Sequence, residues 1–190
     1  MAKVKTKGSK KDYSFQIEVP SEIETNITNN LVVMKKNGKE TKKIMNKLIK
    51  VTKDGNNIKV EVKTAGRREK REFGTVKSHI KNMIEGLMHG YEYDLEICIV
   101  HFPMTVTFDK AKKEFIIKNL LGEKAPRIIG VGGDVEVEIK APMIKIKSHD
   151  LEAAGQTAAN LEKISKIRNR DRNKFQDGIF ITKKPGKIYV

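Results

Sequence analysis

The sequence is poor in cysteine and in long apolar runs. Its single cysteine, Cys98, cannot form a disulfide within the chain, which agrees with a reducing compartment. A membrane-spanning helix needs about 20 apolar residues, but the longest apolar run near the middle of the chain extends only from Ile97 to Val100. A secretory signal needs an apolar segment after its charged start, and residues 1–15 contain none. We therefore expect a cytoplasmic protein that has no membrane partner.

Aromatic and acidic residues are also scarce. The 190 residues allow two domains, but without tryptophan and with only 6% aromatic residues the cores should be modest. Lysine and arginine number 39 against 24 aspartates and glutamates, which leaves a net charge of +15. Such an excess repels itself, and a polyanionic partner would neutralise it. Nucleic acid suits that role better than an anionic membrane surface, because the chain lacks an amphipathic basic helix with large apolar residues.

Residue types used in catalysis and metal binding are scattered. Cys98 and His101 are three residues apart in a predicted strand, so they face opposite sides and cannot form a catalytic dyad; Cys98 should be a buried core residue. Glu136 and Glu138 lie beside Lys140 on a face typical of a solvated strand. The other histidines lack the paired spacing of zinc ligands: His79, His89 and His149. We expect no catalytic residue, metal, cofactor or small-molecule substrate, and hence no enzyme.

The first part of the chain predicts a basic tail followed by short strands. Residues Met1–Asp12 carry few large apolar side chains and are expected to be disordered. The stretch FQIEV alternates apolar and polar residues from Phe15 to Val19, as a half-buried strand does. Two hairpins should follow, with turns at Asn37-Gly38 and Asp54-Gly55, because these dipeptides supply the positive φ of tight turns.

A helix should follow the hairpins. Thr75 is a suitable N-cap and Gly90 a suitable C-terminal stop. Between them, apolar residues recur with the helical period and form one stripe, which should cover a sheet: Val76, Ile80, Met83, Ile84, Leu87 and Met88.

The same order of patterns recurs in the second half. Pro20 and Pro103 lie 83 residues apart, and Gly38 and Gly122 lie 84 apart. We infer an internal duplication and an α+β fold of two duplicated domains, each a small, mostly antiparallel sheet packed by one helix. The boundary is expected near Tyr93, which gives a tail at 1–12, an N-terminal domain at 13–93 and a C-terminal domain at 94–190.

A second helix is predicted over Leu151–Ile167, capped by Ser148 or Asp150. Before it, Gly130 and Gly133 have the GxxG spacing of an RNA-clamping KH loop or of a phosphate-binding loop. Both kinds of loop need a helix directly after the glycines. The next residues alternate apolar and charged side chains instead, which favours a glycine turn between strands.

Basic residues are concentrated in three segments. Two of them, Gly66–Phe73 and Met34–Lys43, are compatible with plain solvated loops. The third, Lys163–Lys174, contains six cations against the single anion Asp171. Its arginines carry planar forks that suit phosphates and stacking, so this segment is expected to contact nucleic acid.

Four segments together resemble a known family. GTVKSHIKNMIEGLMHGYEYDL, HFPMTVTF, KNLLGEK and RNRDRNKFQDGIFI occur in the order typical of the universal large-subunit ribosomal protein called L-six in bacteria and L-nine in eukaryotes. The resemblance covers about Tyr13 to Lys183 and is closest to the eukaryotic and archaeal branch. It implies a non-catalytic protein that binds large-subunit ribosomal RNA near the sarcin-ricin loop and the stalk base, beside neighbouring ribosomal proteins.

The resemblance also implies that the second domain makes most RNA contacts. The matching segments are the turn that contains Glu123 and the stretch Arg168–Gly178. Arg127 is the only arginine in the segment APRIIGVGG, where eukaryotic members usually carry more. The expected RNA-binding residues are Asn119, Gly122, Lys124, Arg127, Lys166, Arg168, Arg170, Arg172, Lys174 and Gly178. The alternative is a basic RNA-binding adaptor outside the ribosome, of KH-like or double-stranded RNA type.

Overall fold

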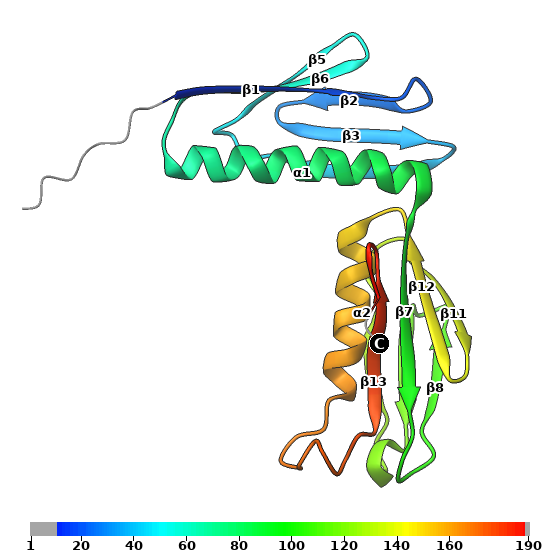
Figure 1. Ribbon diagram of the computed structural model, residues 1–190. Coiled ribbons are helices and arrows are strands. Elements are labelled where there is room, and N and C mark those ends of the chain that lie inside the picture. Colours follow the sequence, from blue (N-terminus) through cyan, green and yellow to red (C-terminus); the bar gives the residue numbers. More distant parts are fainter. Residues whose placement is uncertain (1–10, 189–190) are drawn as a thin grey trace, which may run out of the picture. The chain divides into compact units, whose positions relative to one another are not determined.

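The computed structural model describes residues 11–188 (Figure 1). The expected tail Met1–Asp12 lies outside this range except for its last two residues, which begin strand β1 (Lys11–Glu18). The chain divides into two compact units, Met1–Met88 and His89–Val190. Each unit contains its own hydrophobic core.

The first unit consists of two three-stranded antiparallel sheets and one helix. One sheet has the order β1-β6-β5 and the other β2-β3-β4. Buried residues of both sheets and of helix α1 form a single core. The bounds are β2 (Glu24–Thr28), β3 (Leu31–Lys36), β4 (Lys39–Ile44), β5 (Lys50–Asp54), β6 (Asn57–Ala65) and α1 (Arg67–His89).

Both hairpin turns predicted in this unit are confirmed. Asn37 and Gly38 connect β3 and β4 with φ angles of 49° and 78°, and Gly55 lies between β5 and β6 at φ 59°. A further turn at Asn29 and Asn30, with φ 46° and 66°, connects β2 to β3. Asparagine tolerates this left-handed conformation better than most residues, so local chemistry determines these turns.

Helix α1 begins at Arg67, so the predicted start near Thr75 was wrong. The segment Gly66–Phe73 is mostly the first two turns of the helix and not a loop. Its N-terminus is satisfied by Glu69, whose carboxylate accepts a hydrogen bond of 2.9 Å from the Gly66 N–H. The apolar stripe is recognisable only from Val76 because the preceding turns are mostly charged and place only Phe73 against the core; the predicted end before Gly90 is confirmed.

The second unit repeats this arrangement and adds to it. Its large sheet has the order β11-β12-β7-β13-β14, and its small sheet has the order β10-β9-β8. The run β11-β12-β7 corresponds to β5-β6-β1, and each unit has its helix after the matching hairpin, which confirms the duplicated α+β fold. The bounds are β7 (Tyr91–Cys98), β8 (Thr105–Asp109), β9 (Glu114–Lys118), β10 (Arg127–Gly130), β11 (Glu136–Lys140), β12 (Met143–Ser148), α2 (Leu151–Ser165), β13 (Gly178–Lys184) and β14 (Lys187–Ile188), with a 3-10 turn at Leu120–Gly122.

Two boundaries in the second unit differ from the sequence expectations. The division between the units falls before His89, so the boundary expected near Tyr93 lies inside β7. Helix α2 ends at Ser165 and not at Ile167, because the backbone is already extended at Lys166.

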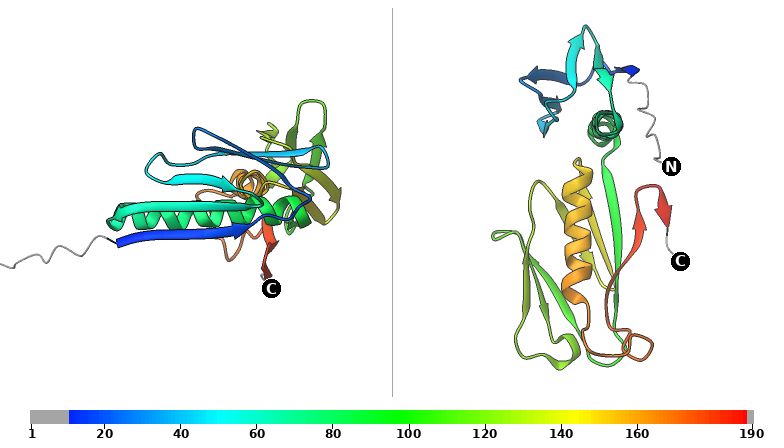
Figure 2. Two further views of the ribbon diagram at one scale, coloured as in Figure 1. Left: turned by 90° about the horizontal axis from the view of Figure 1, so that it is seen from above. Right: turned by 90° about the vertical axis from the view of Figure 1, so that its left-hand side faces the viewer.

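Helix α2 starts where its capping residues predict. The Asp150 carboxylate accepts a hydrogen bond of 2.9 Å from the Glu152 N–H, and the Ser148 hydroxyl accepts one of 3.1 Å from the Asp150 N–H. The helix packs against the large sheet and also contacts β10 (Figure 2). Gly130 ends β10, and β11 follows after a loop, so the GxxG segment is a turn between strands, as favoured.

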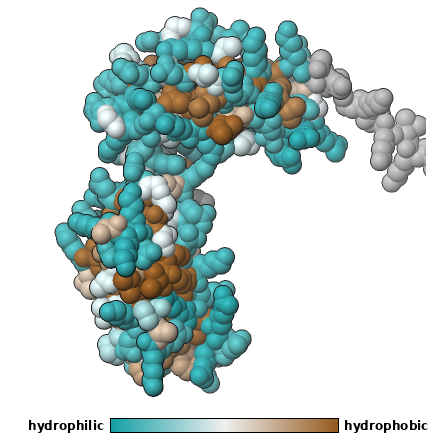
Figure 3. All heavy atoms as spheres, turned by 180° about the vertical axis from the view of Figure 1, so that it is seen from behind, coloured by the Kyte–Doolittle hydropathy of each residue, from teal (hydrophilic) through white to brown (hydrophobic). Residues whose placement is uncertain are grey.

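Polar side chains cover most of the visible face of both units (Figure 3). Hydrophobic side chains show as smaller areas between them. Within residues 11–188, no helix is long and apolar enough to cross a membrane.

Candidate nucleic-acid interface

Most of the cationic segment lies in the loop between α2 and β13, residues 166–177, which we call the cationic loop; Lys163 is still part of α2. Its first end is fixed by Ser165, whose hydroxyl is buried and accepts a hydrogen bond of 3.0 Å from the Ile179 N–H. The same hydroxyl lies 3.0 Å from the Glu162 carbonyl oxygen, to which it can donate. The last turn of α2 and the start of β13 are therefore held together directly behind the loop.

The other end of the cationic loop is fixed by Asp177. Its side chain is only 3% exposed, and Oδ1 accepts hydrogen bonds from the N–H groups of Val100 (2.8 Å) and His101 (2.9 Å). Oδ2 lies 2.6 Å from His101 Nδ1. Burial by itself raises the pKa of Asp177, but the hydrogen bonds from His101 and Val100 outweigh it and lower the pKa to about 2. Asp177 is thus an ionised anchor between this loop and the loop after β7.

The interior of the cationic loop is organised by Asp171. Its Oδ1 accepts a hydrogen bond of 3.0 Å from the Asn173 N–H, and its carbonyl oxygen accepts one of 2.9 Å from the Phe175 N–H. Asn169 adopts a left-handed conformation with φ 58°. Asp171 therefore shapes the turn through hydrogen bonds to the main chain.

Aromatic rings support two of the loop arginines. The Arg170 guanidinium carbon lies 5.4 Å from the centre of the Phe175 ring, and that of Arg172 lies 5.3 Å from the Phe180 ring. The His101 ring stacks on Phe175 with centroids 4.9 Å apart and an interplanar angle of 29°. These contacts restrict both guanidinium groups near the loop surface, which lowers the entropy that a bound partner would have to remove.

The segment between β9 and β10 forms a second loop, Asn119–Lys124, which we call the glycine turn. Asn119 has φ 59°, and its side-chain amide donates a hydrogen bond of 2.9 Å to the Pro103 carbonyl. Gly122 has φ 78°, and a Cβ placed there would lie 3.7 Å from the Phe102 ring. The glycine turn is therefore attached to the loop that follows β7, the same loop that Asp177 holds.

Arg127 connects the glycine turn to the end of α2. Its Nε donates a hydrogen bond of 2.8 Å to Glu123 Oε2, and its Nη2 contacts Glu123 Oε1. Its Nη1 donates to the carbonyl oxygens of Ile164 and, at 3.3 Å, Lys166. The hydrogen bonds and charge of Arg127 lower the pKa of Glu123. The sequence placed Arg127 among the RNA contacts, whereas the structure directs its guanidinium to protein acceptors that an ending helix leaves unpaired.

The other expected site residues lie at the same end of the second unit. Gly178 is buried beside Ser165 at the base of the cationic loop. Asn119 and Gly122 are exposed in the glycine turn. The expected cations are all exposed: Lys124, Lys166, Arg168, Arg170, Arg172 and Lys174. The fold therefore gathers two segments that are far apart in the sequence around one cation-rich end.

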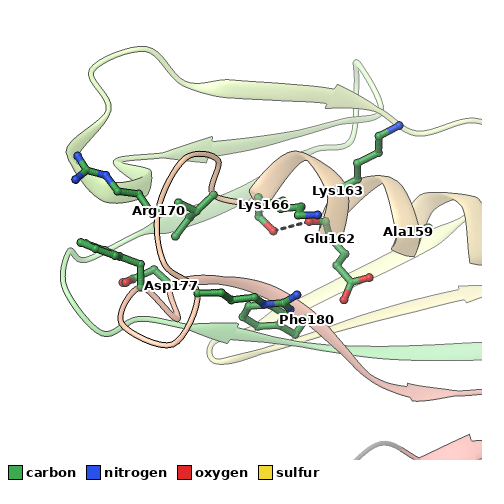
Figure 4. Close-up of a pocket in the computed structure, with 11 residues that line it drawn as sticks. Ala159, Glu162, Lys163, Lys166, Arg170, Asp177 and Phe180 are labelled. Atoms are coloured by element: carbon green, nitrogen blue, oxygen red, sulfur yellow. Dashed lines mark hydrogen bonds between the residues drawn. The ribbon is translucent and has the colours of Figure 1, made fainter.

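A cavity of about 450 Å³ lies between the end of α2 and the cationic loop (Figure 4). Glu162 and Phe180 line it from α2 and β13, and Arg170 projects from the loop away from the helix. We call this cavity the loop pocket. Its lining combines aromatic rings, guanidinium groups and one carboxylate that is not used to anchor the loop.

Sequence reasoning missed the residues that support this end of the unit. His101 was considered only as a catalytic partner of Cys98, and Phe175 and Phe180 were not singled out as supports of the loop. The expectation that Cys98 is buried was wrong, because its side chain at the end of β7 is only partly covered. Burial and the negative charges of Glu96 and Asp177 raise its pKa, so the thiol is poorly ionised.

Metal coordination gains no support from the described part of the chain. Among residues 11–188, no three histidine, cysteine, aspartate or glutamate side chains are grouped so that they could hold a metal ion.

Comparison with known proteins gives a consistent set of relatives. No family profile matches the sequence. The chain is 36% identical over 173 residues to large ribosomal subunit protein uL6 of Haloarcula marismortui, which covers 90% of this chain and 96% of the relative. It is 39% identical over 170 residues to the uL6 protein of Methanobrevibacter smithii, with 89% and 94% covered. The uL6 protein of Staphylothermus marinus is 46% identical over 130 residues, which cover 68% of this chain and 70% of that protein.

Proposed function

Because the chain belongs to the uL6 family of large ribosomal subunit proteins, we propose that its second unit binds ribosomal RNA near the sarcin-ricin loop and the stalk base. Its role in the large subunit is structural and not enzymatic. Neighbouring large-subunit proteins are its other partners, and cytoplasmic ribosomes are its place of action. The protein would support translation by holding RNA in a defined arrangement.

The fixed geometry of the cationic loop is the observation that carries this proposal. Its cations are exposed, while Ser165 and Asp177 hold its two ends by buried hydrogen bonds. A lysine-rich chain end could neutralise phosphates equally well, but it could not define their positions. Contacts to phosphates fix the register and orientation of a nucleic-acid complex, so anchored cations suit a protein that positions RNA.

Recognition should depend mainly on the shape of the RNA backbone. Double-stranded RNA hides its base edges in a deep and narrow groove, which leaves phosphates and 2′-hydroxyl groups for contact. The exposed Gly122 lets the RNA backbone approach the main chain of the glycine turn closely. Lys124 lies two residues further along the same turn and can neutralise a phosphate there.

Two experiments test the proposal: the first tests whether the chain associates with large ribosomal subunits, and the second tests where on the subunit it binds. The full-length chain, expressed with a small tag, should move with large subunits when a lysate is fractionated by sedimentation. If it remains in the light fractions, the chain is a free RNA-binding adaptor and the ribosomal role is wrong.

The position on the subunit requires a second measurement. A photoreactive amino acid placed at Arg168, at the exposed start of the cationic loop, should crosslink to the RNA that forms the sarcin-ricin loop or its neighbours. The same amino acid at Lys112, in the exposed β8–β9 turn, provides the control position. Crosslinks from Arg168 to a distant RNA region would contradict the proposed location but not the large-subunit role.

A further inference from the structure

The loop pocket has a chemical composition that phosphate binding does not explain. Its lining includes two aromatic rings, the Arg172 guanidinium group, an aliphatic side chain and two carboxylates: Phe175, Phe180, Arg172, Ile167, Glu162 and the loop anchor Asp177. Aromatic and aliphatic walls offer nothing to a phosphate, and a carboxylate repels one. Its volume of about 450 Å³ falls in the range of pockets that take small organic groups.

The walls of the loop pocket suit a flat, polarisable group. Phe180 and Arg172 form a ring-and-guanidinium pair, and Phe180 is partly exposed to the pocket. Phe175 is already stacked by His101, so Phe180 is the better surface for a further ring. Unstacked RNA bases bind in this way, on aromatic side chains and on arginine planes.

The rim of the loop pocket provides the complementary charges. Lys163 and Lys166 are exposed at the end of α2 and can neutralise the phosphates on either side of a base. Glu162 lies in the wall, with Oε1 3.5 Å from the Ile181 N–H. An ionised carboxylate has no hydrogen to donate and can only accept hydrogen bonds. It therefore selects groups that donate, such as the exocyclic amino group of a base.

We infer that the loop pocket binds one unstacked RNA base that carries an exocyclic amino group. The base stacks on Phe180 beside Arg172, Glu162 accepts a hydrogen bond from its amino group, and Lys163 and Lys166 contact the flanking phosphates. Adenine, guanine and cytosine carry such a group; uracil donates only through its ring N3–H, which lies between two carbonyl oxygens that a carboxylate repels. The inference rests on the proposed function in one respect, which is that the bound polymer is RNA.

The test uses the full chain and short single-stranded RNAs that contain 2-aminopurine, a fluorescent base with an exocyclic amino group. Stacking in the loop pocket should quench its fluorescence, whereas the same base held in a duplex should show no quenching on binding. Phe180→Leu should weaken binding about fivefold to a hundredfold, because one stacked base is worth about 1–3 kcal/mol. Phe108→Leu, which changes a partly buried phenylalanine of the same unit outside this pocket, should leave the affinity unchanged.

A second variant keeps the test valid if Phe180→Leu perturbs folding. Wild-type protein should bind oligoadenosine and oligocytidine more tightly than oligouridine, and Glu162→Gln should reduce this preference without lowering the melting temperature. Equal affinity for all three oligomers in the wild type, or quenching that survives Phe180→Leu, would overturn the inference. Binding of adenosine monophosphate as tightly as the oligomer would indicate a free-nucleotide site instead.

Failure of this inference can be told apart from failure of the proposed function. If the chain moves with large subunits but 2-aminopurine is not quenched, only the base pocket is wrong. If the chain stays in the light fractions, the ribosomal role is wrong, whatever the oligomers show.

Discussion

Asp177 and His101 are 76 residues apart in the sequence, yet Asp177 Oδ2 lies 2.6 Å from His101 Nδ1. The same carboxylate also accepts two main-chain hydrogen bonds from the loop after β7. That loop in turn contacts the glycine turn through Pro103 and Phe102. One buried carboxylate therefore links the cationic loop to the other segment expected to contact RNA.

Replacing this carboxylate should destabilise the second unit. Asp177→Ala leaves the N–H groups of Val100 and His101 without their acceptor, which should cost about 1–3 kcal/mol and several degrees of melting temperature. Thermal unfolding followed by circular dichroism measures the loss. Asp109→Ala is the matched control, because Asp109 accepts its hydrogen bonds in an exposed turn and should matter less. Equal losses for both variants would show that Asp177 is not a special anchor.

The contribution of Asp177 should disappear in acid. Its folded pKa of about 2 lies below the ordinary value of 3.8, so the ionised form stabilises the fold at neutral pH. This stabilisation is complete well above the ordinary value and is lost as the pH falls through the folded value. The melting temperatures of wild type and Asp177→Asn should therefore differ clearly at pH 5 and converge as the pH falls towards about 2. A difference that persists at the acid limit would contradict this assignment.

Arg127 is expected to act through the protein and not by binding phosphate. Arg127→Lys keeps the charge but removes the fork that holds Glu123 and the end of α2, so the melting temperature should fall. A double-mutant cycle with Glu123→Gln should give a coupling of about 0.2–1 kcal/mol, because both side chains are partly exposed. The salt dependence of RNA binding should not change. A shallower salt dependence in Arg127→Ala, with unchanged stability, would place Arg127 at the RNA instead.

The arginines of the cationic loop should determine the electrostatic part of RNA binding. Changing Arg168, Arg170 and Arg172 together to Ala should weaken binding and flatten the plot of log affinity against log salt by up to about 0.7–0.9 for each phosphate that the variant no longer neutralises. Filter binding to large-subunit RNA at several salt concentrations measures the slope. The charge-matched control changes the three lysines of the exposed β8–β9 turn: Lys110, Lys112 and Lys113. If both triple variants give the same slope, only net charge matters.

Gly178 should not tolerate a side chain. It has φ 150°, and an added Cβ would lie 3.3 Å from the Phe180 ring and 3.6 Å from the Ser165 carbonyl oxygen. Gly178→Ala should therefore cost about 1–3 kcal/mol through backbone strain and crowding. Gly130→Ala is the control, because no atom lies within 4 Å of its added Cβ and its φ is not in the left-handed range. Urea unfolding of the two variants should separate them; similar midpoints would contradict the prediction.

The repeated fold could be predicted because local signals encode it. Asn37-Gly38 and Gly55 supply backbone conformations that few other residues adopt, and the alternation around them shows which residues face the core. The start of α1 could not be predicted, since its first turns have no apolar stripe and depend on the contact between Glu69 and Gly66. Hydrophobic periodicity reveals a helix only where the helix has an apolar stripe, so a helical segment without such a stripe is not recognised from the sequence.

The sequence by itself determined the strands and turns, the apolar stripes of both helices, the duplication and the high density of cations between Lys163 and Lys174. Only the tertiary structure decided that Arg127 holds the end of α2, that Asp177 holds His101, and that Arg172 lies over Phe180. The physical reason is range. Turn chemistry and hydrophobic periodicity depend on residues that are close together in the sequence. The hydrogen-bonding partner of a side chain depends instead on which distant segment the fold places within about 3 Å of it.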